Sequence, residues 1–137
     1  MEDNVPSGFV PFLPHGAFGR HNGTYFEKRE GPRTLRAFRV AAPHLNSAGM
    51  ASGGMLTSFL DLVLARVAAA PGPARFTVRL VTDFLGPARL GDWVEGEGEL
   101  VRRTETLAFV NGLLRVGERP IARASAIFRV ERPPPAG

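Results

Sequence analysis

Residues 53–70, GGMLTSFLDLVLARVAAA, decide the fold of this chain. Apolar side chains recur there at spacings of three and four residues, which is typical of one side of a helix. Those side chains are Leu56, Leu60, Val63, Leu64 and Val67, and Met55, Phe59 and Leu62 fill much of the remaining surface. The pattern predicts a helix buried on nearly all sides. It begins at the double glycine and ends before Pro71-Gly72-Pro73.

Charge is rare in this helix, where Asp61 and Arg66 are the two charged residues between Met55 and Ala70. A carboxylate buried among apolar side chains is costly unless it is paired, protonated or used in chemistry. Asp61 is therefore a candidate reactive group. The structural alternative is a hydrogen bond to Ser58 or Thr57, one turn back on the same face.

The flanking segments read as strands. Residues 25–30 and 34–40 form a predicted pair joined at Gly31-Pro32, and a loop covers residues 41–52. Further strands are predicted at 76–85, 93–103, 107–116 and 121–130, with glycines at 96 and 98 where a sheet can bend or be approached closely. One long apolar helix is best covered by a curved antiparallel sheet wrapped around it. This is the hotdog fold of the α+β class.

The remainder of the chain fits one domain. Residues 1–24 are predicted to be an irregular arm packed on the domain of residues 25–131, and residues 132–137 a disordered tail. No apolar run approaches a membrane span, and the acidic N-terminus has no apolar signal core. The chain has no cysteine, which excludes disulfides and thiolate chemistry. We expect a cytoplasmic protein that does not bind membranes.

The net charge of +4 is carried by sixteen arginines and one lysine against thirteen acidic residues. Arginine suits phosphate groups, so a phosphorylated ligand is one interpretation of this bias. The arginines are dispersed, however, and no nucleic-acid-binding motif is present, so we expect no nucleic-acid partner.

The loop before the helix carries a specific motif. Residues 44–54 read HLNSAGMASGG, and Asp61 follows the second glycine by seven positions. This arrangement resembles the H-x-N-x-x-G-x-x-H-G-G loop and following acidic residue of hotdog-fold acyl-CoA thioesterases of the phenylacetate-degradation type. Similarity at residues 22–25, 83–92 and 103–109 extends the resemblance over about residues 9–130.

The resemblance implies roles for particular residues. Asp61 would be the general base or the nucleophile, and both alternatives stay open. The helix start at Gly53 would stabilise the oxyanion, because helix N-termini offer unpaired N–H groups. Asn46 would add an amide donor or position the thioester. Thr77 matches a hydroxyl that assists the attacking water in some members, although strand propensity explains it equally well.

Ser52 departs from the family pattern, which has histidine before the two glycines. Serine can cap the helix start, and we expect this change to lower turnover. We expect substrate to be bound by Ser52, Gly54, Phe84, Arg89, Arg102 and Arg103, and the resemblance implies that the arginines bind the coenzyme A phosphates. Core packing explains Phe84 equally well. For any single arginine, plain surface solvation remains an alternative. His44 is expected to make a structural loop hydrogen bond. No metal-ligand spacing is present and no cofactor is implied.

Geometry favours an oligomer. Gly53 and Asp61 are eight residues apart, about 12 Å of helix rise. An aspartate side chain is too short to share one carbonyl with the start of its own helix. A two-fold dimer with antiparallel helices would combine Gly53 and Asn46 of one subunit with Asp61 of the other. The resemblance implies the same paired-subunit sites, within a tetramer.

The predicted function is hydrolysis of acyl-CoA to free acid and coenzyme A. The alternative is a hotdog protein that binds acyl-CoA without turnover, as a sensor or scavenger. A hydratase or dehydratase of the same fold is disfavoured, because the histidine-bearing helix-loop segment expected for it is missing.

Overall fold

The computed structural model describes residues 4–69 and 73–132 and folds them into a seven-stranded antiparallel sheet around one long helix. The elements are β1 (Val10–Phe12), α1 (Ala17–His21), β2 (Tyr25–Glu30), β3 (Arg33–Arg39), a 3-10 turn (Ala42–His44), α2 (Gly53–Ala68), β4 (Ala74–Phe84), β5 (Trp93–Arg103), β6 (Leu107–Val116) and β7 (Arg119–Val130). The strand order is β1-β2-β3-β5-β6-β7-β4. The predicted α+β hotdog architecture is confirmed.

Most predicted boundaries lie within two residues of the observed ones. β2, β5 and β6 have the predicted bounds, and α2 ends at Ala68 with Ala69 as its C-cap. Ala70 lies outside the described residues. Residues 133–137 of the predicted disordered tail also lie outside them. Two short elements in the N-terminal arm were not predicted. One of them, β1, is held by pairing with β2, so its position depends on tertiary contacts rather than on local pattern.

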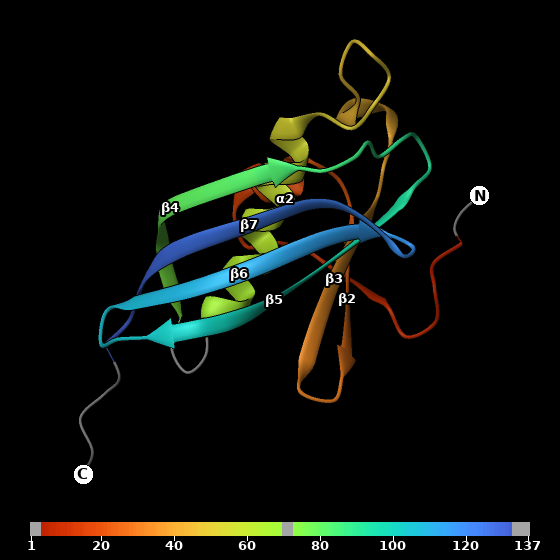
Figure 1. Cartoon of the computed structure of the whole chain (residues 1–137). Coiled ribbons are helices and arrows are strands. Elements are labelled where there is room, and N and C mark those ends of the chain that lie inside the picture. Colours follow the sequence, from red (N-terminus) through yellow and green to blue (C-terminus); the bar gives the residue numbers. More distant parts are fainter. Residues whose placement is uncertain (1–3, 70–72, 133–137) are drawn as a thin grey trace.

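α2 forms the centre of the core, packed mainly on β5 and β6 (Figure 1). Phe59, Leu60 and Leu64 are fully buried there. Burying one such side chain contributes about 1.5–3 kcal/mol, so this face of the helix is a major source of stability.

Glycines let the sheet come close to α2. A Cβ placed on Gly98 would lie 2.7 Å from Leu64 and 2.8 Å from the Asn111 carbonyl oxygen. Gly96 and Gly112 are equally crowded by side chains of the core. The predicted close approach at the glycines of β5 is therefore made by helix side chains.

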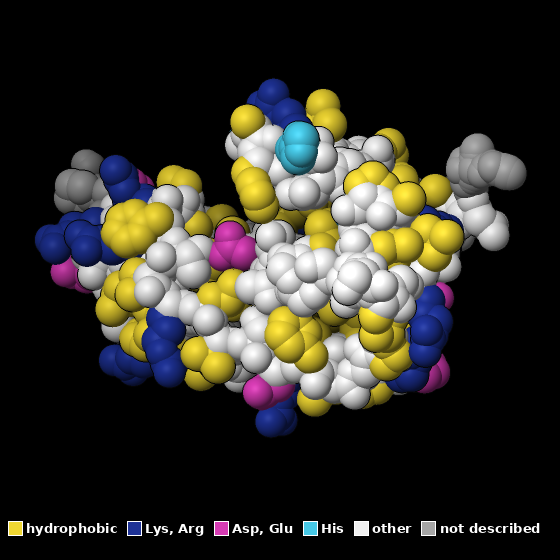
Figure 2. Space-filling view, turned by 90° about the horizontal axis from the view of Figure 1, so that it is seen from above, with side chains coloured by type: hydrophobic (Ala, Val, Ile, Leu, Met, Phe, Trp, Pro, Cys, Tyr) yellow, Lys and Arg dark blue, Asp and Glu magenta, His cyan; other side chains and the backbone are white. Residues whose placement is uncertain are grey.

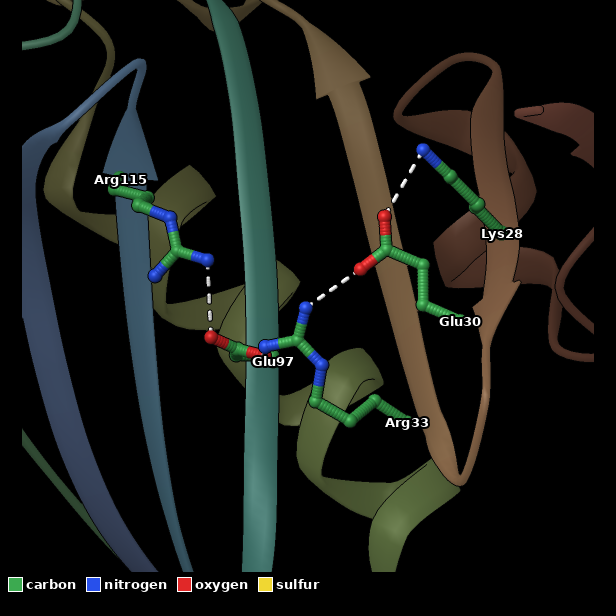
Figure 3. Close-up of polar contacts among 5 residues, drawn as sticks. All are labelled: Lys28, Glu30, Arg33, Glu97 and Arg115. Atoms are coloured by element: carbon green, nitrogen blue, oxygen red, sulfur yellow. Dashed lines mark hydrogen bonds and ion pairs between the residues drawn. The ribbon is translucent and has the colours of Figure 1, made fainter. Parts of the chain in front are cut away.

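The outer face of the sheet carries a chain of ion pairs across four strands (Figure 3). Arg33 binds Glu30 and Glu97, each at 2.6 Å. Lys28 adds a second cation to Glu30, and Arg115 adds one to Glu97. The two arginines and the lysine are thus each paired with a carboxylate.

β4 is an edge strand, paired with β7 on one side. Its apolar side chains Phe76, Val78, Val81 and Phe84 are between 41% and 59% exposed, and Leu85 follows at 49%. Figure 2 looks down on the side where β4 lies, and apolar side chains are spread over that surface while the basic ones lie mainly at its margins. A large apolar exposure on an unpaired edge is a feature of interaction surfaces.

Candidate active site

A cleft of about 920 Å³ opens along α2, between this helix, the region of α1 and the start of β4. The α2 side chains that line it are Thr57, Ser58, Asp61, Leu62, Ala65, Arg66 and Ala69. They are half-buried, so the prediction of a helix buried on nearly all sides is wrong for this stripe. The sheet covers the opposite side of the helix, whereas no element of the described chain covers this one.

Asp61 and Thr77 meet in this cleft. The Thr77 hydroxyl donates to Asp61 Oδ1 at 2.6 Å, from β4 to the third turn of α2. The structural alternative for Asp61, a bond to Ser58 or Thr57, is not formed. Within the described chain, Oδ2 of Asp61 has no hydrogen-bond partner, so this oxygen remains available to a water molecule or a substrate. Thr77 thereby orients the carboxylate.

The loop before α2 is shaped by Asn46. Its Oδ1 accepts from the backbone N–H groups of Ala48 at 2.9 Å and Met50 at 3.1 Å. The Asn46 N–H also donates to the Met50 carbonyl at 2.7 Å. Because the amide oxygen is engaged with two donors, the Nδ2 group is the free end of this side chain. Asn46 is exposed and can offer that amide as a donor.

Ser52 is the N-cap of α2. Its Oγ accepts from the Gly54 N–H at 3.1 Å, and its carbonyl accepts from the Leu56 N–H at 3.0 Å. The Ser52 N–H donates to the His44 carbonyl at 2.8 Å, which ties the motif loop together. The hydrogen bonds of the described residues leave the Gly53 N–H free. Of the two glycines, Gly53 is therefore the one whose N–H can bind an oxyanion.

Phe84 lies against this helix start. A Cβ on Gly53 would be 3.2 Å from Phe84 Cζ, so glycine lets the ring sit close to the backbone. The end of β4 thus covers the first turn of α2, while Thr77, earlier on the same strand, reaches Asp61.

His44 has a structural role in the geometry. Its Nδ1 accepts from the Ala41 N–H at 2.9 Å, so Nε2 carries the proton and donates to the Asn22 carbonyl at 2.6 Å. The ring is 7% exposed and packs edge-on against Phe38. Both nitrogens are engaged, which fits the expected structural hydrogen bonding.

The predicted coenzyme A arginines are not gathered in one place. Arg89 lies beside the motif loop, where Met50 and Arg89 form an isolated β-bridge. Arg102 and Arg103 are at the far end of β5, roughly 30 Å along the strand from its first residue. Arg102 is exposed, and Arg103 donates to the Glu131 carbonyl at 2.7 Å.

Sequence reasoning missed most residues that line the cleft, among them Arg36, Arg66 and Tyr25. Burial lowers the pKa of the Arg36 guanidinium, while the hydrogen bond from Arg36 to Glu27 raises it. Burial raises the pKa of the Tyr25 phenol. The position of Arg36 between Leu35 and Ala37 in its strand gave no clear signal, because Arg33 and Arg39 lie in the same strand.

Among residues 4–69 and 73–132, no group of three or more acidic residues or histidines is placed to hold a metal ion. No helix in the same part of the chain is long and apolar enough to cross a membrane.

Solved structures share this fold. A variant of the phenylacetic acid degradation protein PaaI from Thermus thermophilus superposes with a TM-score of 0.75 at 23% identity, over 84% of this chain and all of that one. A hypothetical thioesterase from Streptococcus pneumoniae, solved with coenzyme A, superposes with a TM-score of 0.70 at 24% identity, over 77% of this chain and 87% of that one.

Sequence comparison agrees with the fold. The family model described as the thioesterase superfamily matches residues 48–122, which include Gly53, Asp61 and Thr77. The chain is 34% identical over 131 residues to PA0474 of Pseudomonas aeruginosa, whose name marks it as a candidate esterase. That match covers 93% of this chain and 98% of the relative. The chain belongs to the thioesterase superfamily, and the resemblance seen in its motif loop is confirmed.

Proposed function

We propose that this protein hydrolyses acyl-CoA thioesters to free acid and coenzyme A. The observation that carries the proposal is the Asp61–Thr77 pair in the cleft. Of the described residues that line the cleft, Asp61 alone is acidic. The coenzyme A in the structure of the pneumococcal relative supports the choice of thioester carrier.

The chemistry needs a nucleophile and a place for negative charge. Asp61 either removes a proton from the attacking water or attacks the thioester carbonyl itself to give a mixed anhydride. In both cases the carbonyl oxygen becomes negative. The free N–H of Gly53, at the positive end of the α2 dipole, stabilises that oxygen together with the Asn46 amide.

Two copies of the chain complete the site in this proposal. The rise of about 12 Å between Gly53 and Asp61 keeps one chain from placing both on a single carbonyl. β4 carries Thr77 and Phe84 and has a free edge with exposed apolar side chains. A two-fold contact along this surface brings Asp61 and Thr77 of one protomer toward Gly53 and Asn46 of the other.

A second candidate function is binding of acyl-CoA without turnover. The observation that favours it is Ser52, whose Oγ is engaged in capping Gly54 and which stands where the family motif has histidine. The capped loop still leaves Gly53 N–H and Asp61 Oδ2 without partners in the described chain, so hydrolysis remains the first choice.

The test is release of free thiol from a panel of acyl-CoAs, with wild type and with Asp61→Asn. Asparagine keeps the shape of the side chain and removes both base and nucleophile. We expect kcat/KM to fall by at least about 10²- to 10⁴-fold. Asp83→Asn, which removes a carboxylate elsewhere on β4, should remain active. Asp61→Asn activity within a few-fold of wild type would contradict the assignment, and acyl-CoA binding without turnover by wild type would favour the second function.

A further inference from the structure

Two guanidinium groups line the cleft beyond Asp61, those of Arg36 and Arg66. Arg66 is five residues further along α2, about 7.5 Å of helix rise from Asp61. Its side chain is half-buried and makes no hydrogen bond or ion pair within the described chain. Its guanidinium group therefore has no counter-ion within the described chain.

Arg36 is held in place from the other wall. Its Nε donates to Glu27 Oε1 at 2.9 Å and its Nη1 to the Leu62 carbonyl at 3.0 Å. The Phe12 ring lies 4.3 Å from the guanidinium carbon. Its side chain is 13% exposed, and its Nη2 group has no partner in the described chain. Burial lowers the pKa of Arg36, Glu27 raises it, and the positive charge of Arg66 lowers it, so the two guanidinium groups lie within electrostatic reach of each other.

This arrangement differs from that of the cations on the outer face of the sheet. There, Lys28, Arg33 and Arg115 are each paired with a carboxylate. Beside the cleft, Glu27 accepts a hydrogen bond from Arg36. Asp61 accepts one from Thr77 and none from either arginine. A half-buried cation without a counter-ion favours the binding of an anion, because such an ion restores the lost solvation.

The anion would lie at the end of a short apolar path. Leu62, Ala65 and Ala69 line the cleft on the α2 side, and Leu80 lines it from β4. Such walls suit methylene groups rather than the polar pantetheine arm or a nucleotide. The reacting carbonyl belongs beside Asp61, so the group that continues to the arginines is the acyl chain.

We propose that the preferred substrate is a thioester whose short acyl chain ends in a carboxylate, with Arg66 and Arg36 binding that carboxylate. This inference rests on the proposed thioester hydrolysis and specifies its substrate class. A planar guanidinium is well suited to carboxylate through paired N–H donors. A neutral acyl end would displace water from the two guanidinium groups without supplying a counter-ion, which gives discrimination against it.

The test compares glutaryl-CoA with 5-methylhexanoyl-CoA, in which an isopropyl group replaces the carboxylate at nearly equal shape. We expect wild type to favour glutaryl-CoA by about tenfold or more in kcat/KM, and Arg66→Met to remove most of that preference. Arg29→Met, which removes one exposed arginine of β2 outside the cleft, is the charge-matched control and should keep it. N-acetylcysteamine thioesters of the same two acids lack the coenzyme A phosphates and should show the same preference.

The outcomes separate the two proposals. Equal hydrolysis of both acyl-CoAs by wild type, or an unchanged ratio in Arg66→Met, overturns the carboxylate site and leaves thioester hydrolysis intact. The carboxylate site is also overturned if the preference for the glutaryl ester vanishes with the N-acetylcysteamine thioesters. The arginines would then bind the phosphates of coenzyme A. If neither thioester is cleaved, and no member of the acyl-CoA panel is cleaved either, thioester hydrolysis fails. Calorimetric binding of both CoA esters to Asp61→Asn, with and without Arg66→Met, then decides the carboxylate site alone: tighter glutaryl-CoA binding that depends on Arg66 supports it, and equal binding overturns it.

Discussion

The two long sides of α2 have opposite surroundings. One side packs on β5 and β6, where glycines let helix side chains reach the sheet backbone. The other side faces the cleft, and its stripe from Thr57 to Arg66 is half-buried. The packed side stabilises the fold. The open side carries the side chains that can react with a ligand or bind it. Changes on the first side should therefore alter stability, and changes on the second should alter turnover.

The largest effect is expected on the packed side, from Gly98→Ala. The added Cβ would lie within 2.8 Å of both Leu64 and the Asn111 carbonyl oxygen, and a backbone atom cannot move aside cheaply. We expect a loss of about 3 kcal/mol in the free energy of unfolding, measured by urea denaturation. Gly16→Ala is the control, because a Cβ there meets nothing within 4 Å. Equal stability of the two variants would show that the sheet does not constrain the helix as described.

The next largest effect belongs to the open side. Thr77→Val keeps the shape of the side chain and removes the hydroxyl that donates to Asp61. We expect kcat/KM for thioester hydrolysis to fall by about tenfold, with little change in stability. Thr82→Val is a matched control on the same strand, since the Thr82 hydroxyl is buried without a hydrogen-bond partner in the described chain. That variant should keep its activity and be as stable as wild type or more so. Equal loss of activity in both variants would remove Thr77 from the mechanism.

Ser52→His restores the family motif at the junction between the two sides. We expect kcat to rise by less than about tenfold, while stability falls by about 1 kcal/mol because the Ser52 cap on Gly54 is lost. Ser52→Ala separates the two effects, since it removes the cap without adding an imidazole. If Ser52→His and Ser52→Ala are both slower than wild type, serine is itself functional in this loop and the expectation is wrong.

The smallest effect is expected on the outer face of the sheet. Hydrogen bonds from Arg33 and then Lys28 hold the pKa of Glu30 below its ordinary value of 4.5. The stabilisation is therefore present above pH 4.5 and is lost as the pH falls through the folded-state pKa. Glu30→Gln should lower the melting temperature slightly at pH 7 and by less at pH 3, with activity unchanged. A larger difference at pH 3 than at pH 7 would contradict the sign of this shift.

The sequence predicted one side of α2 better than the other. Its apolar spacing and the glycines at 96 and 98 reflect the contact with β5, which local pattern encodes. The open stripe could not be predicted, because Leu62 and Ala65 have the same apolar character as the buried positions. What differs is the absence of a covering element, and that depends on tertiary arrangement.

In the candidate site, too, some residues could be predicted from local sequence pattern and others depend on tertiary arrangement. The motif spacing predicted Asp61, Asn46 and Gly53 as site residues, and these roles stay predictions. The structure adds the hydrogen bond from Thr77 to Asp61, which the sequence left undecided. Arg36 was not predicted as a site residue because it is 25 residues from Asp61 in sequence. It lines the cleft because β3 places it there. Whether Arg102 joins the site depends on a second chain, so its role stays a prediction.

The most direct test of the shared active site mixes two inactive variants, Asp61→Asn and Asn46→Ala, under conditions of subunit exchange. In the proposed shared site, Asp61 and Asn46 come from different chains. Each hybrid dimer would then have one site with both defects and one with neither. We predict that hydrolysis of acyl-CoA returns on mixing, toward half of the wild-type rate per hybrid dimer. Verified hybrids that remain inactive would place all catalytic groups within one chain and contradict the account.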